Sequence, residues 1–398
     1  MSQLFTGFTL IDGTGAEPVE NAALLLRDGR VVWAGPRAEL PAEGGEAEAV
    51  DLTGHTVIPG LIDAHVHVCW NGRESVPDLV KRDRDALLLE AVETLRRIVA
   101  SGTTSVRDIG GQDYMEMALR KAVEAGQILG PRMRTSGKII TMTGGHGHFA
   151  AREADGVDEL RKAAREQIKA GADNIKLMAT GGVATPGQDV QASQFTVEEM
   201  AAAVQAAHAL GRTAAAHCHG AGGIKNSLLA GMDSIEHGSY LDEETAEMMV
   251  KHGAALVLTL GVANPNLDEI PSAARAEAER MQEPLETVRK RVRETVVLAR
   301  EKGVFVGSGS DAGGNPLAPH DFSMAVELEE LVAHGFSPLE ALTIATGNNA
   351  RVLRWEEELG TLEAGKWADF VVLAADPLVD ISHVRHVEAV FKGGEKVA

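Results

Sequence analysis

Two histidines, His65 and His67, stand at the end of an apolar run and are separated by a single residue. Side chains two positions apart on a strand point to the same side, so both imidazoles would face one direction. Neutral imidazole nitrogens are good ligands for a divalent metal ion. A pair this short also arises by chance in a chain with 14 histidines. It predicts a metal site only together with further ligands.

Four further candidate ligands, Lys176, His217, His237 and Asp311, each follow or end an apolar run of their own. A lysine inside such a run is costly to bury as an unpaired ammonium, so it needs a partner or a chemical modification. Other roles stay open at this point. Lys176 is also compatible with an ion pair to Asp173, the two histidines with hydrogen-bonded core positions, and Asp311 with the N-cap of a helix.

The middle of the chain alternates strand-like and helix-like segments, which indicates parallel βα units. The strand-like segments are residues 62–67, 103–108, 134–141, 174–179, 213–217, 234–237, 256–260 and 304–308. Between them, Leu88, Val92, Leu95 and Val99 form a helical stripe, and residues 196–199 read as a capping box. Eight units predict an α/β fold of the (β/α)8 TIM-barrel type. Its functional groups lie at the C-terminal strand ends, where every candidate ligand falls.

Both ends of the chain read as short strands joined by turns. The N-terminal strands are predicted at residues 4–11, 22–26 and 31–34, and the C-terminal strands at residues 359–361, 368–373 and 387–391. Asp28-Gly29 is a strong hairpin signal, since both residues tolerate positive φ. We predict one small β-sandwich domain from residues 1–58 and 356–398, beside a barrel of residues 59–355.

Two predicted loops, residues 181–194 and 261–281, are longer than a barrel requires and follow its fourth and seventh strands. Long loops at this face usually form binding walls or lids. Contacts within a homo-oligomer, which we also expect, explain the second loop equally well.

The formal net charge of −20 argues against nucleic acid or an anionic membrane surface as a partner. No apolar run approaches the roughly 18 residues of a membrane span, and the N-terminus does not resemble a signal peptide. We therefore expect a cytoplasmic protein. Its two cysteines, Cys69 and Cys218, argue against a disulfide framework and are predicted to be small wall residues.

Five motifs, in order along the chain, resemble the amidohydrolase superfamily. They are Pro-Gly-Leu-Ile-Asp-Ala-His-Val-His at residues 59–67, Ile-Lys at 175–176, Ala-His-Cys-His-Gly at 216–220, Ile-Glu-His-Gly at 235–238 and Gly-Ser-Asp-Ala at 309–312. Residues 144–148 and 176–183 are further similar to the binuclear, prolidase-like branch. That branch contains Xaa-Pro and Xaa-Arg/Lys dipeptidases and hydrolases of other acyl-amino acids.

The resemblance implies two divalent ions, with zinc as the first expectation, although manganese and cobalt suit the same ligands. The implied ligands are His65, His67 and Asp311 for the first ion, His217 and His237 for the second, and Lys176, as its carbamate, between the two. Carbamylation turns the buried ammonium into an anion that two cations neutralise.

The implied reaction is hydrolysis of an amide bond in a dipeptide or N-acyl amino acid by a hydroxide that bridges the two ions. Asp311 would take the proton of the attacking hydroxide and pass it to the leaving amine. His146, His219 and Tyr240 lie near strand ends and suit a carbonyl oxygen or an α-carboxylate of the substrate. Each of the three is equally suited to holding a loop.

Two other functions remain open. A mononuclear relative, such as an imidazolonepropionase or an aminohydrolase that deaminates a ring, would lack the bridging lysine. A noncatalytic scaffold of the same superfamily would typically have lost metal ligands, and here the whole set is present.

Overall fold

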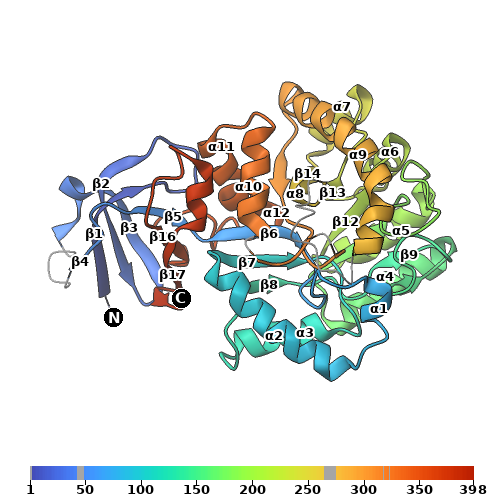
Figure 1. Ribbon diagram of the computed structural model, residues 1–398, viewed down its shortest axis with the longest axis horizontal. Helices are drawn as coiled ribbons and strands as arrows, with labels where there is room; N and C mark the ends of the chain where they lie inside the picture. Colours follow the sequence, from blue (N-terminus) through green and yellow to red (C-terminus); the bar gives the residue numbers. More distant parts are fainter. Residues whose placement is uncertain (1, 43–48, 264–274, 317, 322) are drawn as a thin grey trace.

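The computed structural model describes residues 2–42, 49–263, 275–316, 318–321 and 323–398. A sheet built from both termini lies at one end of the molecule, and a larger α/β part occupies the rest (Figure 1). The acidic run at residues 43–48 lies outside the described residues.

The terminal sheet has eight strands, which confirms that the two ends of the chain meet. They are β1 (Ser2–Leu10), β2 (Val19–Arg27), β3 (Arg30–Pro36), β4 (Ala49–Asp51), β5 (Thr56–Pro59), β16 (Phe370–Leu373), β17 (Val387–Lys392) and β18 (Glu395–Lys396). The β2–β3 hairpin turns at Asp28 and Gly29, with φ of 51° and 79°, as their residue types predict. The hydrogen bonds join all eight strands in a single sheet. A two-layered sandwich and the exact domain limits stay predictions.

The α/β part contains two parallel sheets of a TIM-barrel-like fold. Their strands are β6 (Leu61–Val66), β7 (Thr103–Asp108) and β8 (Arg132–Arg134) in one sheet, and β9 (Ile140–Thr141), β10 (Arg152–Glu153), β11 (Asn174–Met178), β12 (Thr213–Cys218), β13 (Ser234–His237), β14 (Ala255–Leu258) and β15 (Val306–Ser308) in the other. From β11 to β15 the spatial order follows the sequence order, as expected for repeated βα units.

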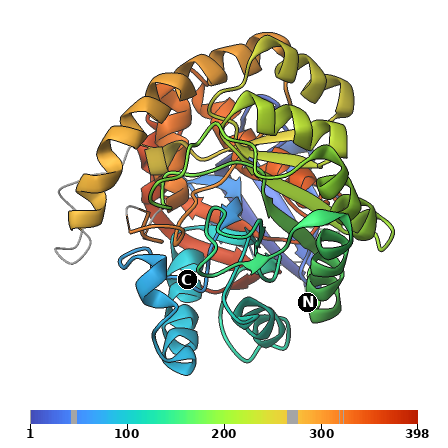
Figure 2. The same ribbon diagram turned by 90° about the vertical axis from the view of Figure 1, so that its right-hand side faces the viewer.

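Helices surround these strands (Figure 2). They are α1 (Val76–Leu79), α2 (Arg84–Ala100), α3 (Met115–Glu124), α4 (Gly156–Ala170), α5 (Val197–His208), α6 (Ala221–Ala230), α7 (Glu243–His252), α8 (Leu260–Ala263), α9 (Arg275–Lys302), α10 (Ser323–Ala333), α11 (Pro338–Thr343) and α12 (Asn349–Val352). The predicted capping box begins α5, where Thr196 and Glu199 each bond the other's backbone. No described helix is long and apolar enough to cross a membrane.

The segment after β15 lies against the end of β6. The backbone amide of Asp311 donates to the carbonyl of His65 (2.8 Å), and the amide of His67 donates to the carbonyl of Ala312 (2.9 Å). Gly309 permits this approach, because an added Cβ would lie 2.4 Å from the His65 backbone nitrogen. These contacts bring the His65–His67 pair beside Asp311. A continuous ladder around the whole ring stays a prediction.

Two predicted strands differ from the structure. The segment predicted at residues 134–141 is divided between β8 and β9, because Gly137 adopts a left-handed conformation (φ 75°) that ends the extended chain. Residues 359–361 form a bend and not a strand, and Gly360 is again left-handed, with φ 95°. Local hydrophobicity did not reveal either break.

Candidate metal centre

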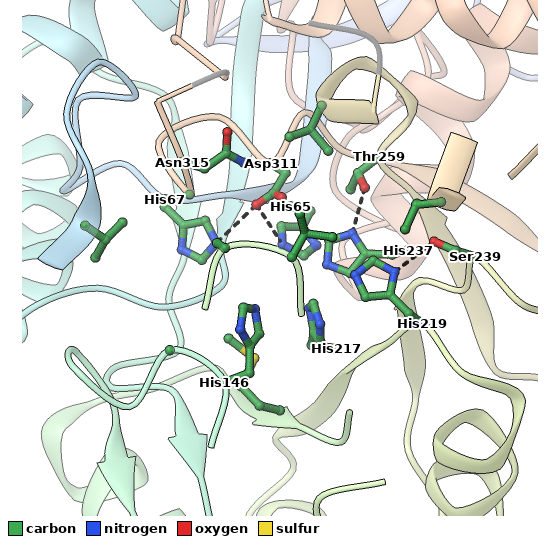
Figure 3. Close-up of a pocket in the computed structure, with 18 of the residues that line it drawn as sticks. His65, His67, His146, His217, His219, His237, Ser239, Thr259, Asp311 and Asn315 are labelled. Carbon is green, nitrogen blue, oxygen red and sulfur yellow. Dashed lines mark hydrogen bonds and ion pairs between the residues drawn. The ribbon is translucent and has the colours of Figure 1, made fainter. Parts of the chain in front are cut away.

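A cavity of about 110 Å³ lies at the C-terminal ends of the barrel strands and is lined by eight of the nine predicted site residues (Figure 3). These eight are His65, His67, His146, Lys176, His217, His219, His237 and Asp311. The ring centroids of His146 and His217 are 4.6 Å apart, and those of His217 and His237 are 4.7 Å apart. Residues up to 246 positions apart in the sequence therefore converge on one small volume.

Strand register places these side chains at matching heights. Met178 pairs with His217, and Cys218 pairs with His237, so the ends of β11, β12 and β13 are level. Two of the candidates also occupy left-handed backbone, His237 with φ 68° and Asp311 with φ 53°. This conformation is uncommon for residues with a side chain and is typical of functional sites, where surrounding contacts hold it.

Asp311 is the anionic member of the cluster. Its Oδ1 lies 3.4 Å from Nε2 of His65 and 3.4 Å from Nε2 of His67. The ligand atoms of His65, His237 and Asp311 all lie within 4.8 Å of one another, which makes these three a candidate metal site. Asp311 does not cap a described helix, since α10 starts at Ser323.

Each histidine of the cluster has one ring nitrogen held by a neighbouring group. Nδ1 is the held atom in five of the six, with partners Glu236 for His65 (2.8 Å), the carbonyl of Gly110 for His67 (2.7 Å), Thr185 for His146 (2.8 Å), Ser239 for His219 (2.8 Å) and Thr259 for His237 (2.7 Å). His217 is reversed, because its Nε2 lies 3.2 Å from the carbonyl of Gly181.

This arrangement fits metal ligation. A carboxylate or carbonyl partner can only accept, so the held nitrogen of His65, His67 and His217 carries a proton, and a bound metal ion would take the other nitrogen of each ring. Burial further lowers the pKa of His146 to about 3 and of His219 to about 4, and it lowers the pKa of His217 and His237 well below the ordinary range. These four imidazoles are therefore neutral at pH 7, the form that binds metal.

Lys176 is fully enclosed, with 1% of its surface exposed, on the all-buried strand β11. Its ammonium forms no hydrogen bond with the described residues, and burial lowers its pKa to about 8. The alternative pairing with Asp173 is wrong, because Asp173 lies with the guanidinium groups of Arg120, Arg134 and Arg212. A buried amine without a partner, facing histidines and Asp311, fits a lysine that is carbamylated and bound by cations.

The three predicted substrate contacts are placed differently. His146 and His219 line the cavity, whereas Tyr240 is not among the described residues that do so. The Tyr240 ring instead lies 5.8 Å from the guanidinium of Arg291 on α9. Its neighbour Ser239 reaches the cavity and holds His219. Two other histidines, His148 and His208, bond the carbonyl of Gly145 and the carboxylate of Asp233 respectively.

The walls of the cavity are apolar. The described part of α9 contributes Met281, Leu285, Val288 and Val292, spaced so that they share one helix face. Met281 and Leu285 pack against Val183 and Ala184 of the loop after β11. Both long predicted segments therefore reach the cavity, although residues 264–274 of the second lie outside the described residues. Among the described lining residues, ionisable side chains occur only in the histidine, Lys176 and Asp311 cluster.

Sequence reasoning missed Arg107 and Glu236, which lie under the cluster and are buried in β7 and β13. The available signal was the one that identified Lys176, namely an ionisable residue inside an apolar run. Thr185, Ser239 and Thr259 were also missed, because a hydroxyl that holds an imidazole has no pattern in the sequence.

This chain is similar to known proteins over most of its length. The model of a family described as "Amidohydrolase family" matches residues 56–397. The ochratoxinase of Aspergillus niger is 31% identical over 424 residues, covering 97% of this chain and 84% of that protein. An imidazolonepropionase of Bradyrhizobium sp. is 25% identical over 400 residues, covering 92% and 90%. A crystal structure of a Xaa-Pro dipeptidase with bound methionine in the active site superposes with a TM-score of 0.87 at 30% identity, covering 100% and 99%.

Replacing Lys176 with Met tests whether the unmodified amine is a destabilising buried charge. The native pKa of about 8 lies below the ordinary 10.5, so between these values the unfolded chain binds more protons than the native one. The stability of metal-free wild type should therefore rise from about pH 8 to 10, and the Met variant should lack this contribution. Urea unfolding of the chelated proteins at pH 7, 8, 9 and 10 measures both slopes. Equal slopes would contradict the burial of a free amine.

Proposed function

The chain belongs to the amidohydrolase family, and on that premise we propose that it is a binuclear metal-dependent hydrolase of dipeptides or N-acyl amino acids with an apolar leaving residue. The observation that carries the proposal is the cavity in which Lys176, Asp311 and the histidines converge, with one ring nitrogen of each anchored imidazole held by a neighbouring group.

The proposed ligands divide into two groups. His65, His67 and Asp311 would hold one ion, which their 3.4 Å contacts support. His217 and His237 would hold the other, with Lys176 as a carbamate between them. The ring centroids of His217 and His237 are 4.7 Å apart, and the buried Lys176 amine lies beside them. His237 also lies close to His65 and Asp311, so the two ions would be neighbours.

Divalent ions bound here would activate a water molecule and polarise the scissile carbonyl. Asp311 is the carboxylate nearest to that chemistry and is proposed to accept a proton from the attacking water and deliver it to the leaving amine. Burial by itself would raise the pKa of Asp311, but His65 and His67 outweigh this effect and lower it. The side chain is therefore ionised and able to accept a proton.

The apolar walls support an apolar substrate. A basic leaving side chain would need an acidic partner, and no acidic residue lies on the described wall outside the metal cluster. Asp189, the acidic residue of the loop after β11, is exposed and accepts from the backbone amide of Gln191. Asp268 and Glu269, in the second long segment, lie outside the described residues. The methionine bound in the related dipeptidase structure is also an apolar amino acid.

A free carboxylate on the substrate would need fixed donors. His146 and His219 present their Nε2 side to the cavity, because Thr185 and Ser239 hold Nδ1. Gly182 allows His146 this position, since an added Cβ would lie 2.3 Å from its Nε2. We propose these two imidazoles as the carboxylate contacts.

The principal alternative is a mononuclear enzyme of the imidazolonepropionase kind, which is similar to this chain at 25% identity. The buried Lys176 favours the binuclear enzyme, because a single ion leaves this amine without a role. The noncatalytic scaffold is disfavoured by the complete set of donors around the cavity. A cytoplasmic location, homo-oligomeric assembly and the absence of nucleic-acid and membrane partners remain our proposals.

The function is tested by metal content together with a substrate panel. Purified enzyme should contain two divalent ions per chain and hydrolyse Xaa-Pro, Xaa-Leu and Xaa-Phe dipeptides faster than Xaa-Arg. Amidating the substrate carboxylate should cost about 1.5 to 3 kcal/mol in kcat/KM, the range for a hydrogen bond to a charged group. Full activity with one ion per chain would contradict the binuclear proposal. Equal turnover of free and amidated substrates would remove the carboxylate contact.

Asp311→Asn should lower kcat by about 100-fold or more, because the amide cannot take the proton. The variant must be assayed with its metal content known, since Asp311 is also a proposed ligand. A variant that keeps both ions and a near wild-type kcat would exclude the proton-transfer role.

Leu285→Glu should convert part of the apolar wall into an anionic one. We expect kcat/KM to fall for Xaa-Leu and to rise for Xaa-Arg, changing their ratio by about tenfold or more, as for one charged contact. Val297→Glu is the matched control, because it adds the same charge to an exposed face of α9. Similar ratios in both variants would show that α9 does not contact the leaving side chain.

A further inference from the structure

A buried ion pair, Arg107 with Glu236, lies beneath the metal cavity. Glu236 on β13 has no exposed surface, and Arg107 on β7 is 2% exposed. The guanidinium Nη2 donates to both carboxylate oxygens, at 2.8 and 2.9 Å. A second cavity of about 230 Å³ begins on the other side of the pair and is lined by Arg107 and by Thr213 and Ser234, the first residues of β12 and β13. The pair thus occupies the barrel interior between the two cavities.

The described polar contacts of the pair lead to His65, to its strand β6 and to Ser234 on β13. Glu236 Oε2 accepts from Nδ1 of His65 at 2.8 Å. Arg107 donates from Nε to the carbonyl of Ala64 (2.6 Å), the residue before His65, and from Nη1 to the hydroxyl of Ser234 (3.0 Å). That hydroxyl donates to Glu236 Oε1 at 2.5 Å. The strand, the imidazole and the carboxylate are therefore fixed with respect to one another.

His65 differs in this respect from the other proposed ligands. His67 and His217 are held by backbone carbonyls and His237 by the hydroxyl of Thr259. Among the described contacts of these proposed ligands, His65 alone has its Nδ1 held by a carboxylate. A carboxylate fixes the proton on Nδ1 and makes Nε2 a stronger electron donor than a neutral partner does.

We propose that Glu236, held in place by Arg107 and Ser234, is a positioning residue that presents Nε2 of His65 to the metal ion beside Asp311. The inference rests on the proposed function, since it requires an ion at His65. Arg107 contributes by balancing the buried carboxylate, which would be costly to bury alone. The charges of Arg107 and Glu236 cancel. The net charge around the metal ions therefore comes from the ligands alone.

The test compares metal loss from Glu236→Gln and from the double variant Arg107→Met/Glu236→Gln. The amide of Gln can donate as well as accept, so it no longer fixes the His65 proton. Proteins loaded with Zn²⁺ or Co²⁺ are mixed with a chelator, and ion release is followed over time. We expect release from one of the two sites to become about 10 to 100-fold faster, as is typical when the hydrogen-bond partner of a ligand histidine is lost. The Co²⁺ absorption spectrum should change as well.

Two comparisons keep the test specific. Asp369→Asn alters another bidentate Arg–Asp pair, between Arg132 of β8 and Asp369 beside β16, and should release metal at the wild-type rate. If Glu236→Gln alone fails to fold because it leaves Arg107 unpaired, the double variant, which buries no charge at either position, decides the question.

The possible failures are distinguishable. Wild-type release rates and an unchanged Co²⁺ spectrum in the double variant overturn the positioning role and leave the proposed function intact. Equally fast release from Asp369→Asn also overturns it, because the effect would then be general destabilisation. A wild-type protein that binds no divalent ion overturns the proposed function together with this inference.

Discussion

Lys176 is buried among histidines and apolar side chains, and the rest of the barrel must compensate for the charge of its amine. An ammonium enclosed by β11 cannot be solvated, and the described residues give it no hydrogen bond. The nearby negative groups, Glu236 and Asp311, favour its charged form, whereas Arg107 opposes it. The unmodified site is therefore an unfavourable assembly that a carbamate and two cations would complete. Such a site lowers the stability of the metal-free protein in exchange for a chemically useful group.

The barrel meets this requirement with two kinds of structure. Strands of matching register bring the donors to one level, and the left-handed residues His237 and Asp311 turn the chain where a regular strand would continue. The helix α9 and the loop after β11 then surround the donors with apolar side chains that contribute no charge. Ionisable side chains of the described lining are confined to the centre of the cavity, and its wall is mostly apolar, so the wall residues could change without altering the proposed ligands.

Much of the fold was predictable because its signals are local. Alternating strand and helix patterns placed the barrel strands, the residue types at Asp28-Gly29 placed the hairpin, and Thr196 with Glu199 placed the start of α5. The errors occurred where a single backbone conformation overrides hydrophobicity. Gly137 divides the third predicted strand, and Gly360 turns the segment predicted as a C-terminal strand. Tyr240 was placed near the cavity by its position along the chain, but its ring lies against α9.

The sequence by itself determined which residue types stand at the ends of the apolar strands, and hence that His65, His67, Lys176, His217, His237 and Asp311 would lie at one end of a parallel barrel. This follows from chain connectivity and strand periodicity, which are properties of neighbouring residues. Only the tertiary structure decided which nitrogen of each histidine is held by a neighbouring group, that Asp173 is occupied by arginines and not by Lys176, and that Arg107 and Glu236 contact His65 and its strand. The contacts around His65 join residues 129 and 171 positions apart, and the contact of Asp173 with Arg120 spans 53 positions. Hydrogen-bond direction and burial at such separations are set by packing in three dimensions.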